Sequence, residues 1–222
     1  MPPIYNIVHL YKIQYTPWMS ELTAPDAEGF QIGLGMSESD LPRAAELFDL
    51  AFSDKFRKAI PESSMRIRIW ESALDPKQIM AGYLDGNLVS IAVLSFKEKT
   101  GFRKAATPTI LKILGLRRIP LALITFALFE KRIPVDHLYI EAISVAPDVR
   151  GMGLGSTTIE AIRSTAVRNR LKTMTLQVIR GNESAKKLYE RHGFVVEDFV
   201  ENLLMKYLSG INGAYKMRCD IN

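Results

Sequence analysis

Hydrophobic and polar positions repeat along this chain with two different periods. In some stretches apolar residues recur every three to four positions, which indicates amphipathic helices that bury one face. In others they alternate with polar residues or run together briefly, which is typical of strands. We therefore expect helices at 41–51, 65–73, 154–170 and 182–192, and strands at 30–36, 78–84, 88–96, 137–145, 173–179, 194–200 and 214–219.

The order of these elements predicts the fold class. Asp85-Gly86-Asn87 joins two of the expected strands, and Asp-Gly is a strong signal for a hairpin turn. Later in the chain strands and helices alternate. An early hairpin followed by this alternation favours an α/β fold of the α+β type, with one mixed sheet and helices on both faces. A length of 222 residues allows one sizeable core and is short for two.

Two segments fall outside this regular pattern. Residues 1–29 contain four prolines and show no clear period, so we assign them as an N-terminal extension to a single domain at 30–222. Residues 97–134 are an insert that is basic at first and then apolar at helical spacing, with a break expected at Pro120. We expect the apolar face of this insert to pack on the domain or on a second subunit, which leaves a homodimer open.

Composition and charge narrow the class of protein. Apolar residues make up 47% and charged residues 24% of the chain, which is ordinary for a soluble globular protein. The net charge of +5 suits an anionic ligand, but the basic residues are dispersed, so we expect no nucleic-acid partner. The longest nearly apolar run, 119–129, is too short to span a membrane, and no signal peptide is recognisable. One cysteine fits a reducing cytoplasmic location, and the scattered histidines predict no metal site.

The most informative segment is the glycine-rich stretch from Arg150 to Ser156, between an expected strand and an expected helix. Its glycines allow close approach to the backbone, and the first amides of a helix have no intrahelical partner and favour an anion. A Walker loop needs a lysine after its last glycine, and none is present. A dinucleotide site needs an acidic residue at the end of the next strand, and residues 171–179 contain none. A phosphate or pyrophosphate cradle remains, with a purely structural tight turn as its alternative.

The strand before this loop contains a change of phase. Leu138 and Ile140 share one face by their period of two, and so do Ile143 and Val145, but the alternation slips by one residue near Glu141-Ala142. Such a slip within an apolar strand is typical of a β-bulge, which splays neighbouring strands and leaves backbone groups unpaired. An unpaired amide in a cleft can bind a carbonyl oxygen.

A second motif follows the next strand. It runs from Asn182 to Phe194, with an asparagine cap, a short helix and a glycine stop. Together, V-x-P-x-x-R-G-x-G-x-G and N-x-S-A-x-x-L-Y-x-x-x-G-F resemble the GNAT superfamily of N-acetyltransferases. The resemblance is specific over 138–194 and weaker over 30–96, where the order of elements also matches, and it does not extend to 1–29 or 97–134.

The resemblance implies a GNAT-like single domain, with a mostly antiparallel sheet of six to seven strands around a splayed, bulged central strand. It implies acetyl-CoA as cofactor, with its pyrophosphate on the loop amides and its pantetheine arm beside the central strand. It also implies that Asn182 contacts the cofactor and that Tyr189 protonates the leaving thiolate. The expected cofactor-binding residues are Ile143, Ser144, Val145, Arg150, Gly151, Met152, Gly153, Leu154, Gly155, Ser156, Asn182, Ala185 and Tyr189.

The sequence offers two candidates for the general base, Glu141 and His137. Glu141 lies at the slip, where a cleft should open, and could take a proton from the ammonium group directly or through water. His137 occupies a strand position that carries a catalytic glutamate in some family members, and histidine titrates near neutral pH. A mechanism without a dedicated base is the third alternative. The catalytic candidates are therefore Tyr189, Glu141 and His137.

The predicted activity is direct transfer of an acetyl or short acyl group from acyl-CoA to a primary amine, within a ternary complex. The acceptor is expected to be a small molecule or a peptide, and the insert at 97–134 is expected to cover the acceptor side. The alternative is a non-catalytic member of the family that binds acyl-CoA as a sensor or interaction module.

Overall fold

The computed structural model describes residues 28–103, 106–115, 133–201, 206, 210 and 212–221. Nearly all of the extension at 1–29, the second half of the insert at 97–134 and most of 202–211 lie outside the described residues. The expectations for those segments therefore remain predictions.

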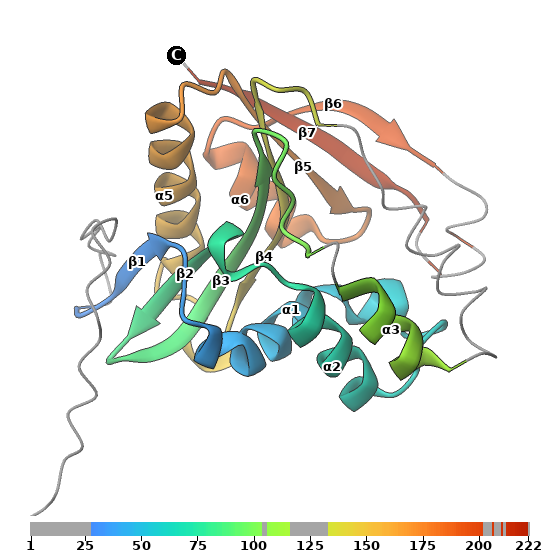
Figure 1. The fold of residues 1–222 in the computed structure, drawn as a ribbon. Helices are drawn as coiled ribbons and strands as arrows, with labels where there is room; N and C mark the ends of the chain where they lie inside the picture. The colour runs from blue at the N-terminus through green and yellow to red at the C-terminus, as the bar shows by residue number, and fades with distance from the viewer. Residues whose placement is uncertain are drawn as a thin grey trace, which may run out of the picture.

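Seven strands of the described chain form one sheet in the order β1-β2-β3-β4-β5-β7-β6 (Figure 1). Every neighbouring pair is antiparallel except β4 and β5, which run parallel. The predicted mixed, mostly antiparallel sheet is thus confirmed. The strands are β1 (Gln31–Leu34), β2 (Ile79–Leu84), β3 (Asn87–Phe96), β4 (His137–Val145), β5 (Thr173–Ile179), β6 (Val195–Val200) and β7 (Ala214–Asp220).

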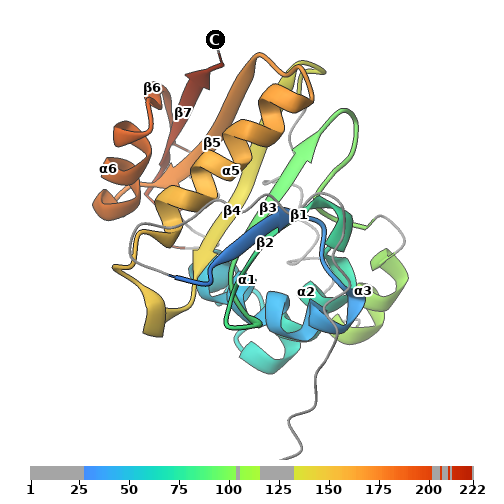
Figure 2. The ribbon, with the colours of Figure 1, turned by 90° about the vertical axis from the view of Figure 1, so that its left-hand side faces the viewer.

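Helices cover both faces of the sheet, as the pattern predicted. α5 lies across one face, where it contacts β1 to β5, and α1 packs against β3 and β4 on the other (Figures 1 and 2). α2 packs on α1, and α3 packs on α2. The helices are α1 (Leu41–Phe56), α2 (Ser63–Ala73), α3 (Thr107–Leu114), α5 (Leu154–Arg168) and α6 (Glu183–Arg191).

Element boundaries agree closely with the hydrophobic pattern around the central strands. β4 and β5 begin and end at the predicted residues. α5 ends two residues earlier than expected, because Arg170 adopts a left-handed φ of 56° and the Leu171 amide bonds back to the Ala166 carbonyl. A left-handed residue stops a helix in this way.

A buried ion pair fixes α1 against α2. Arg66 Nε and Nη2 donate to the two carboxylate oxygens of Asp49, at 2.8 and 2.9 Å. Trp70 Nε1 and Ser63 Oγ donate to the same carboxylate, and Arg66 Nη1 donates to the Ile60 carbonyl. Burial by itself raises the pKa of the Asp49 carboxyl, but these bonds hold that pKa below its usual value. The fully bonded pair therefore sets the position of α1, which forms one wall of the site described below.

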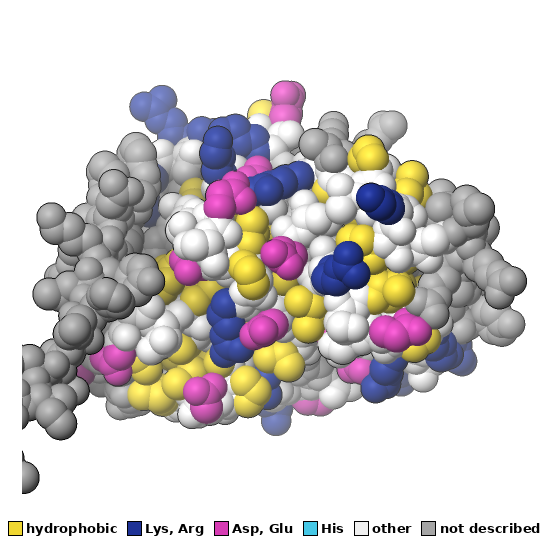
Figure 3. Space-filling view, turned by 60° about the horizontal axis from the view of Figure 1, so that its bottom comes forward, with side chains coloured by type: hydrophobic (Ala, Val, Ile, Leu, Met, Phe, Trp, Pro, Cys, Tyr) yellow, Lys and Arg dark blue, Asp and Glu magenta, His cyan; other side chains and the backbone are white. Residues whose placement is uncertain are grey.

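Charges of both signs mix on the face that carries α1, α2 and α3. Figure 3 shows Lys and Arg side chains interspersed there with Asp and Glu and with hydrophobic side chains. Exposed ion pairs also form on α1, such as Arg43 with Glu46 at 2.8 Å. The net charge of +5 is therefore not gathered on this face. Among the described helices, none combines the length and the hydropathy needed to cross a membrane.

Candidate active site

The site begins where β4 and β5 separate. Their parallel ladder runs from the pair His137 and Thr173 to the pair Ile140 and Leu176, and it ends there. Glu141 is also extra in the pairing with β3, because Val93 pairs with Ala142 and Leu94 pairs with Ile140. The bulge predicted from the phase slip is therefore confirmed, at Glu141. A bulge bends its strand and increases the local twist, which carries the rest of β4 away from β5.

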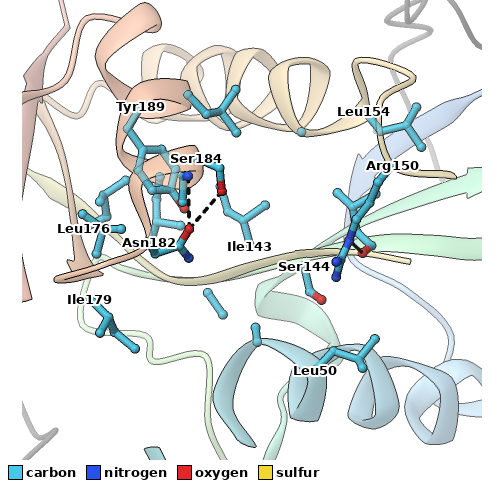
Figure 4. Close-up of a pocket in the computed structure, with 18 of the residues that line it drawn as sticks. Leu50, Ile143, Ser144, Arg150, Leu154, Leu176, Ile179, Asn182, Ser184 and Tyr189 are labelled. Atoms are coloured by element: carbon cyan, nitrogen blue, oxygen red, sulfur yellow. Dashed lines mark hydrogen bonds between the residues drawn. The ribbon is translucent and has the colours of Figure 1, made fainter. Parts of the chain in front are cut away.

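A cavity of about 970 Å³ fills the space between the separating strands. Its floor is the unpaired end of β4 and β5, and its upper rim is the glycine loop with the first turn of α5 (Figure 4). One side is formed by α6 with Asn182 and Tyr189, and α1 closes the other side with Leu50, Ala51, Phe52 and Asp54. Beyond Ile140, alternate N–H and C=O groups of β4 point toward this unpaired edge and can bind an extended ligand.

The glycine loop presents the N-terminus of α5 to the cavity. Gly151 and Gly153 have φ values of 90° and 78°, a conformation that side chains with a Cβ rarely adopt. Gly153 is the N-cap of α5, so no side chain caps this helix, and no acidic residue lies in its first turn. The first intrahelical bond joins the Thr157 amide to the Gly153 carbonyl, which leaves the preceding amides to the cavity. The helix end can thus receive an anion without competition from its own carboxylates.

Arg150 adds a positive charge beside this helix end. Its Nε donates to the Val145 carbonyl at 3.2 Å, which ties the guanidinium to the end of β4 (Figure 4).

Gly155 has a different role from the other two glycines, because a Cβ there would come within 3.3 Å of Leu188 Cδ2. Gly155 therefore lets α5 and α6 pack closely, whereas Gly151 and Gly153 shape the loop.

α6 places Asn182 and Tyr189 on the opposite side of the cavity. Asn182 Oδ1 accepts from the Ala185 amide at 3.2 Å and from Ser184 Oγ at 3.1 Å, so the predicted asparagine cap is confirmed (Figure 4). The amide Nδ2 is then the group of Asn182 that can donate to a ligand. The Tyr189 carbonyl accepts from the His192 and Phe194 amides, which fixes the last turn of α6 and with it the tyrosine ring.

Tyr189, Tyr139 and Glu141 lie close enough to the floor of the cavity and to one another to interact electrostatically. Burial raises the pKa of Tyr189 to about 12. Burial also raises the pKa of Tyr139, and the Glu141 charge and then Tyr189 raise it further. Both tyrosines are therefore neutral hydroxyl donors at physiological pH. Glu141 lines the cavity beside them, and its Oε1 accepts from Ser95 Oγ at 2.9 Å.

Two predicted residues do not line the cavity. His137 lies at the far end of the β4–β5 ladder, where its Nε2 is 3.7 Å from Asp136 Oδ1. Met152 stands between the two left-handed glycines and packs against the hydrophobic core. The other predicted site residues, from Glu141 through Ser156 to Tyr189, are brought together around this cavity.

The α1 wall and Ser95 were not among the residues predicted from the sequence. Leu50, Ala51 and Phe52 continue the helical apolar pattern of α1, so nothing distinguishes them from core positions. Leu50 is 50% exposed, which a period alone does not show. Ser95 breaks the apolar run of β3 between Leu94 and Phe96, and a polar residue there is the signal that could have pointed to it.

Comparisons with known proteins agree with this geometry. The family model described as "Acetyltransferase (GNAT) family" matches residues 44–194, which is more than half of the chain. The curated 5-NmdU N-acetyltransferase of Pseudomonas phage PaMx11 is 43% identical over 65 residues, covering 29% of this chain and 43% of that protein. The match thus spans less than half the length of the phage protein.

Solved structures share the fold at low identity. An N-acetyltransferase from Staphylococcus aureus Mu50 superposes with a TM-score of 0.62 at 20% identity, over 84% of this chain and 98% of that one. Arabidopsis thaliana Naa50, solved in complex with the bisubstrate analogue CoA-Ac-MVNAL, gives a TM-score of 0.50 at 16% identity, over 86% and 97% of the two chains. The family match, the bulged central strand and the uncapped glycine loop concur, and the protein belongs to the acetyltransferase (GNAT) family, a family of acyl-transfer enzymes.

Proposed function

We propose that this protein transfers an acetyl or short acyl group from acyl-CoA to a primary amine, by direct transfer within a ternary complex. The observation that carries the proposal is the single cavity that joins the α5 N-terminus to Glu141 and Tyr189 along the unpaired edge of β4. The cavity thus offers the α5 N-terminus for the pyrophosphate of acyl-CoA and the unpaired edge of β4 for its pantetheine arm. Glu141 and Tyr189 are then available for proton transfer at its thioester.

The residues present fit acyl-CoA. The loop amides and Arg150 would hold the pyrophosphate, and the β4 edge from Ile143 to Val145 would pair with the extended pantetheine arm. Asn182, the N-cap of α6, lines the same path and would donate to the cofactor through Nδ2. When bound, acyl-CoA supplies an activated thioester, and a β4 amide at the bulge can donate to its carbonyl oxygen. The chain therefore aligns the thioester with the floor of the cavity, and alignment can lower a barrier by on the order of 7 to 11 kcal/mol.

Glu141 is the base that the geometry favours over His137, because Glu141 lines the cavity and His137 does not. A neutral amine attacks the thioester carbon, so a proton must leave the ammonium group before the new C–N bond can form. Glu141 can accept this proton directly or through one water. As the C–S bond breaks, its electrons would stay on the sulfur, and the second proton that the amine nitrogen loses on becoming an amide would balance the proton that this thiolate takes up.

Tyr189 is the residue that we propose as hydrogen-bond donor to the thiolate of CoA. With a pKa of about 12, Tyr189 stays protonated throughout the physiological range. A thiol has a reference pKa of about 8.5, so complete proton transfer costs about 5 kcal/mol from these two values. We therefore assign Tyr189 first as a hydrogen-bond donor to the developing thiolate, with transfer completed as the product leaves.

The acceptor enters from the α1 side in this proposal. Leu50 offers an apolar contact and Asp54 a carboxylate on that wall, and Glu141 lines the same cavity. These two acidic groups suit an ammonium substrate that approaches from this side. The described start of the insert at 97–134 also meets the floor here, through the Gly101 amide and Ser95, which supports its place on the acceptor side.

Binding and turnover test the proposal separately. Calorimetry should give micromolar affinity for CoA and acetyl-CoA and none for NAD or ATP. Release of free thiol should then be followed with peptide N-terminal amines, lysine side-chain amines, polyamines and 5-NmdU, the substrate in the name of the phage relative. Intersecting double-reciprocal plots are expected for a ternary complex, and parallel plots would contradict it. Tight CoA binding without turnover on any amine would instead favour the sensor role.

A further inference from the structure

We propose that Ser95 is a positioning residue, which holds the Glu141 carboxylate ionised and oriented toward the acceptor amine. This inference rests on the proposed function, since it assigns a partner to the base of the same reaction. Ser95 lies in β3, is fully buried, and does not itself line the cavity.

The direction of the hydrogen bonds is fixed by the chemistry of the groups. The Gly101 amide donates to Ser95 Oγ at 2.9 Å, so the Ser95 oxygen acts there as acceptor. An ionised carboxylate can only accept, so the Ser95 O–H must donate to Glu141 Oε1, also at 2.9 Å. The amide, the hydroxyl and the carboxylate form a chain in which each bond polarises the next.

Glu141 needs such a partner because it is the bulged residue. Val93 and Leu94 pair with Ala142 and Ile140, so Glu141 has no opposing residue in β3. The regular ladder therefore does not set the direction of this side chain. Ser95 comes from the neighbouring strand and reaches the carboxylate from one side, which limits the rotation of the glutamate.

The Gly101 end of the chain is itself firmly placed. A Cβ at Gly101 would lie 2.2 Å from Val93 Cγ1, so only glycine allows this segment to lie so close to β3. The Gly101 carbonyl accepts from the Asp75 amide at 2.9 Å, which ties the segment to the connection between α2 and β2. A fixed amide keeps the Ser95 hydroxyl turned toward Glu141.

A donor to the charged carboxylate favours the ionised form over the protonated form. Other charged and titratable groups share the cavity with Glu141, namely Asp54, Arg150, Arg180, Tyr189 and Arg191, and Tyr139 adjoins it on β4. A Ser95→Ala change leaves all of these side chains in place. A change in the pH dependence of that variant therefore reports on the lost bond to Glu141.

The test is the pH profile of kcat/KM for Ser95→Ala, Ser95→Cys and a matched control. Ser90→Ala is that control, because Ser90 is on the same strand and fully buried, and its Oγ has no hydrogen-bond partner among the described residues. Ser95→Ala should move the acid limb upward by about one pH unit and lower kcat about tenfold at neutral pH. Ser95→Cys, with its weak S–H donor, should fall between Ser95→Ala and the unchanged protein. Ser90→Ala should overlay the unchanged protein.

The same series in a Glu141→Gln background separates the two proposals. There Ser95→Ala should change kcat less than twofold, because the ionised partner is gone. A strongly impaired Glu141→Gln variant, combined with an unmoved acid limb in Ser95→Ala, would overturn the role of Ser95 and leave the base role intact. A fully active Glu141→Gln variant with an unaltered profile would overturn both. Melting temperatures of all variants show that each one is folded under assay conditions.

Discussion

Ile140 and Leu176 form the last pair of the parallel ladder between β4 and β5. The next residue of β4 is the bulged Glu141, so the loss of pairing on one edge coincides with an extra residue on the other. The cleft is thus a consequence of local strand geometry, because the added twist turns the remainder of β4 away from its neighbour. Both groups proposed for proton transfer stand at this point of separation.

A Ser156→Glu substitution should weaken acetyl-CoA binding by at least about 100-fold, which is about 2.7 kcal/mol. Ser156 is in the first turn of α5 and lines the cavity, so a carboxylate there would lie beside the bound pyrophosphate. The same carboxylate favours the helix itself, so the melting temperature should be kept or raised. Calorimetry and thermal unfolding together check this. Ser156→Gln has nearly the same shape without the charge, and equal binding by the two variants would argue against an anion at this helix end.

How much of this site could be read from the sequence depends on the kind of signal. The bulge at Glu141 was predictable because a slip in a period of two is visible within a single strand. The α5 N-terminus was predictable because glycine spacing is local too. The α1 wall was not, since Leu50 reaches the cavity only after α1 packs on the sheet. Met152 was assigned to the cofactor by its place in the motif, through its main-chain amide; its side chain packs against the core, and the role of its amide stays a prediction.

Two glycines of the loop should respond differently to alanine. Gly153→Ala should cost about 1–2 kcal/mol of unfolding free energy, because φ at this position is 78° and a Cβ is strained there. Gly155 lies within α5, where alanine is favoured over glycine by about 1 kcal/mol. The contact with Leu188 Cδ2 offsets part of that gain, so Gly155→Ala should change stability by less than Gly153→Ala. Urea denaturation measures both, and the reverse order would contradict the loop geometry.

The Asp49–Arg66 pair should make stability depend on acid. Burial raises the pKa of Asp49, but its bonds lower it more, so the folded pKa lies below the unfolded value of about 3.9. The contribution of the pair is therefore complete at neutral pH and is lost as the pH falls below that value. Asp49→Asn should cost about 3–5 kcal/mol at pH 7 and flatten the acid dependence of unfolding. Glu46→Gln, which breaks an exposed pair of equal length with Arg43, should cost under about 1 kcal/mol. Equal losses in the two variants would show that burial of the pair is irrelevant.

Tyr189→Phe should lower kcat about 100-fold and leave the KM for acetyl-CoA within about twofold, because the hydroxyl acts on the leaving thiolate rather than on binding. Since the pKa of Tyr189 is about 12, the protonated form is retained up to at least about pH 11. The rate of the unchanged protein should therefore show no alkaline decline near pH 10, where an ordinary tyrosine ionises. Tyr215→Phe makes the same chemical change outside the cavity and should behave as the unchanged protein. A decline near pH 10 that disappears in Tyr189→Phe would contradict the raised pKa of this tyrosine.

Leu50→Ala should raise the KM for the amine and spare the KM for acetyl-CoA. Leu50 projects from α1 on the side of β4 opposite Leu154 and Tyr189 (Figure 4), and half of its surface is exposed, so an apolar part of the acceptor can cover it. Removing most of that side chain should cost about 1–2 kcal/mol of acceptor binding, or about 5- to 30-fold in KM. Val167 on α5 is 52% exposed and does not line the cavity, so Val167→Ala is the matched control and should change neither constant. Steady-state kinetics with each substrate varied in turn decides the matter. If Leu50→Ala raised the KM for acetyl-CoA instead, the α1 wall would belong to the cofactor, and the amine would have to enter from another side.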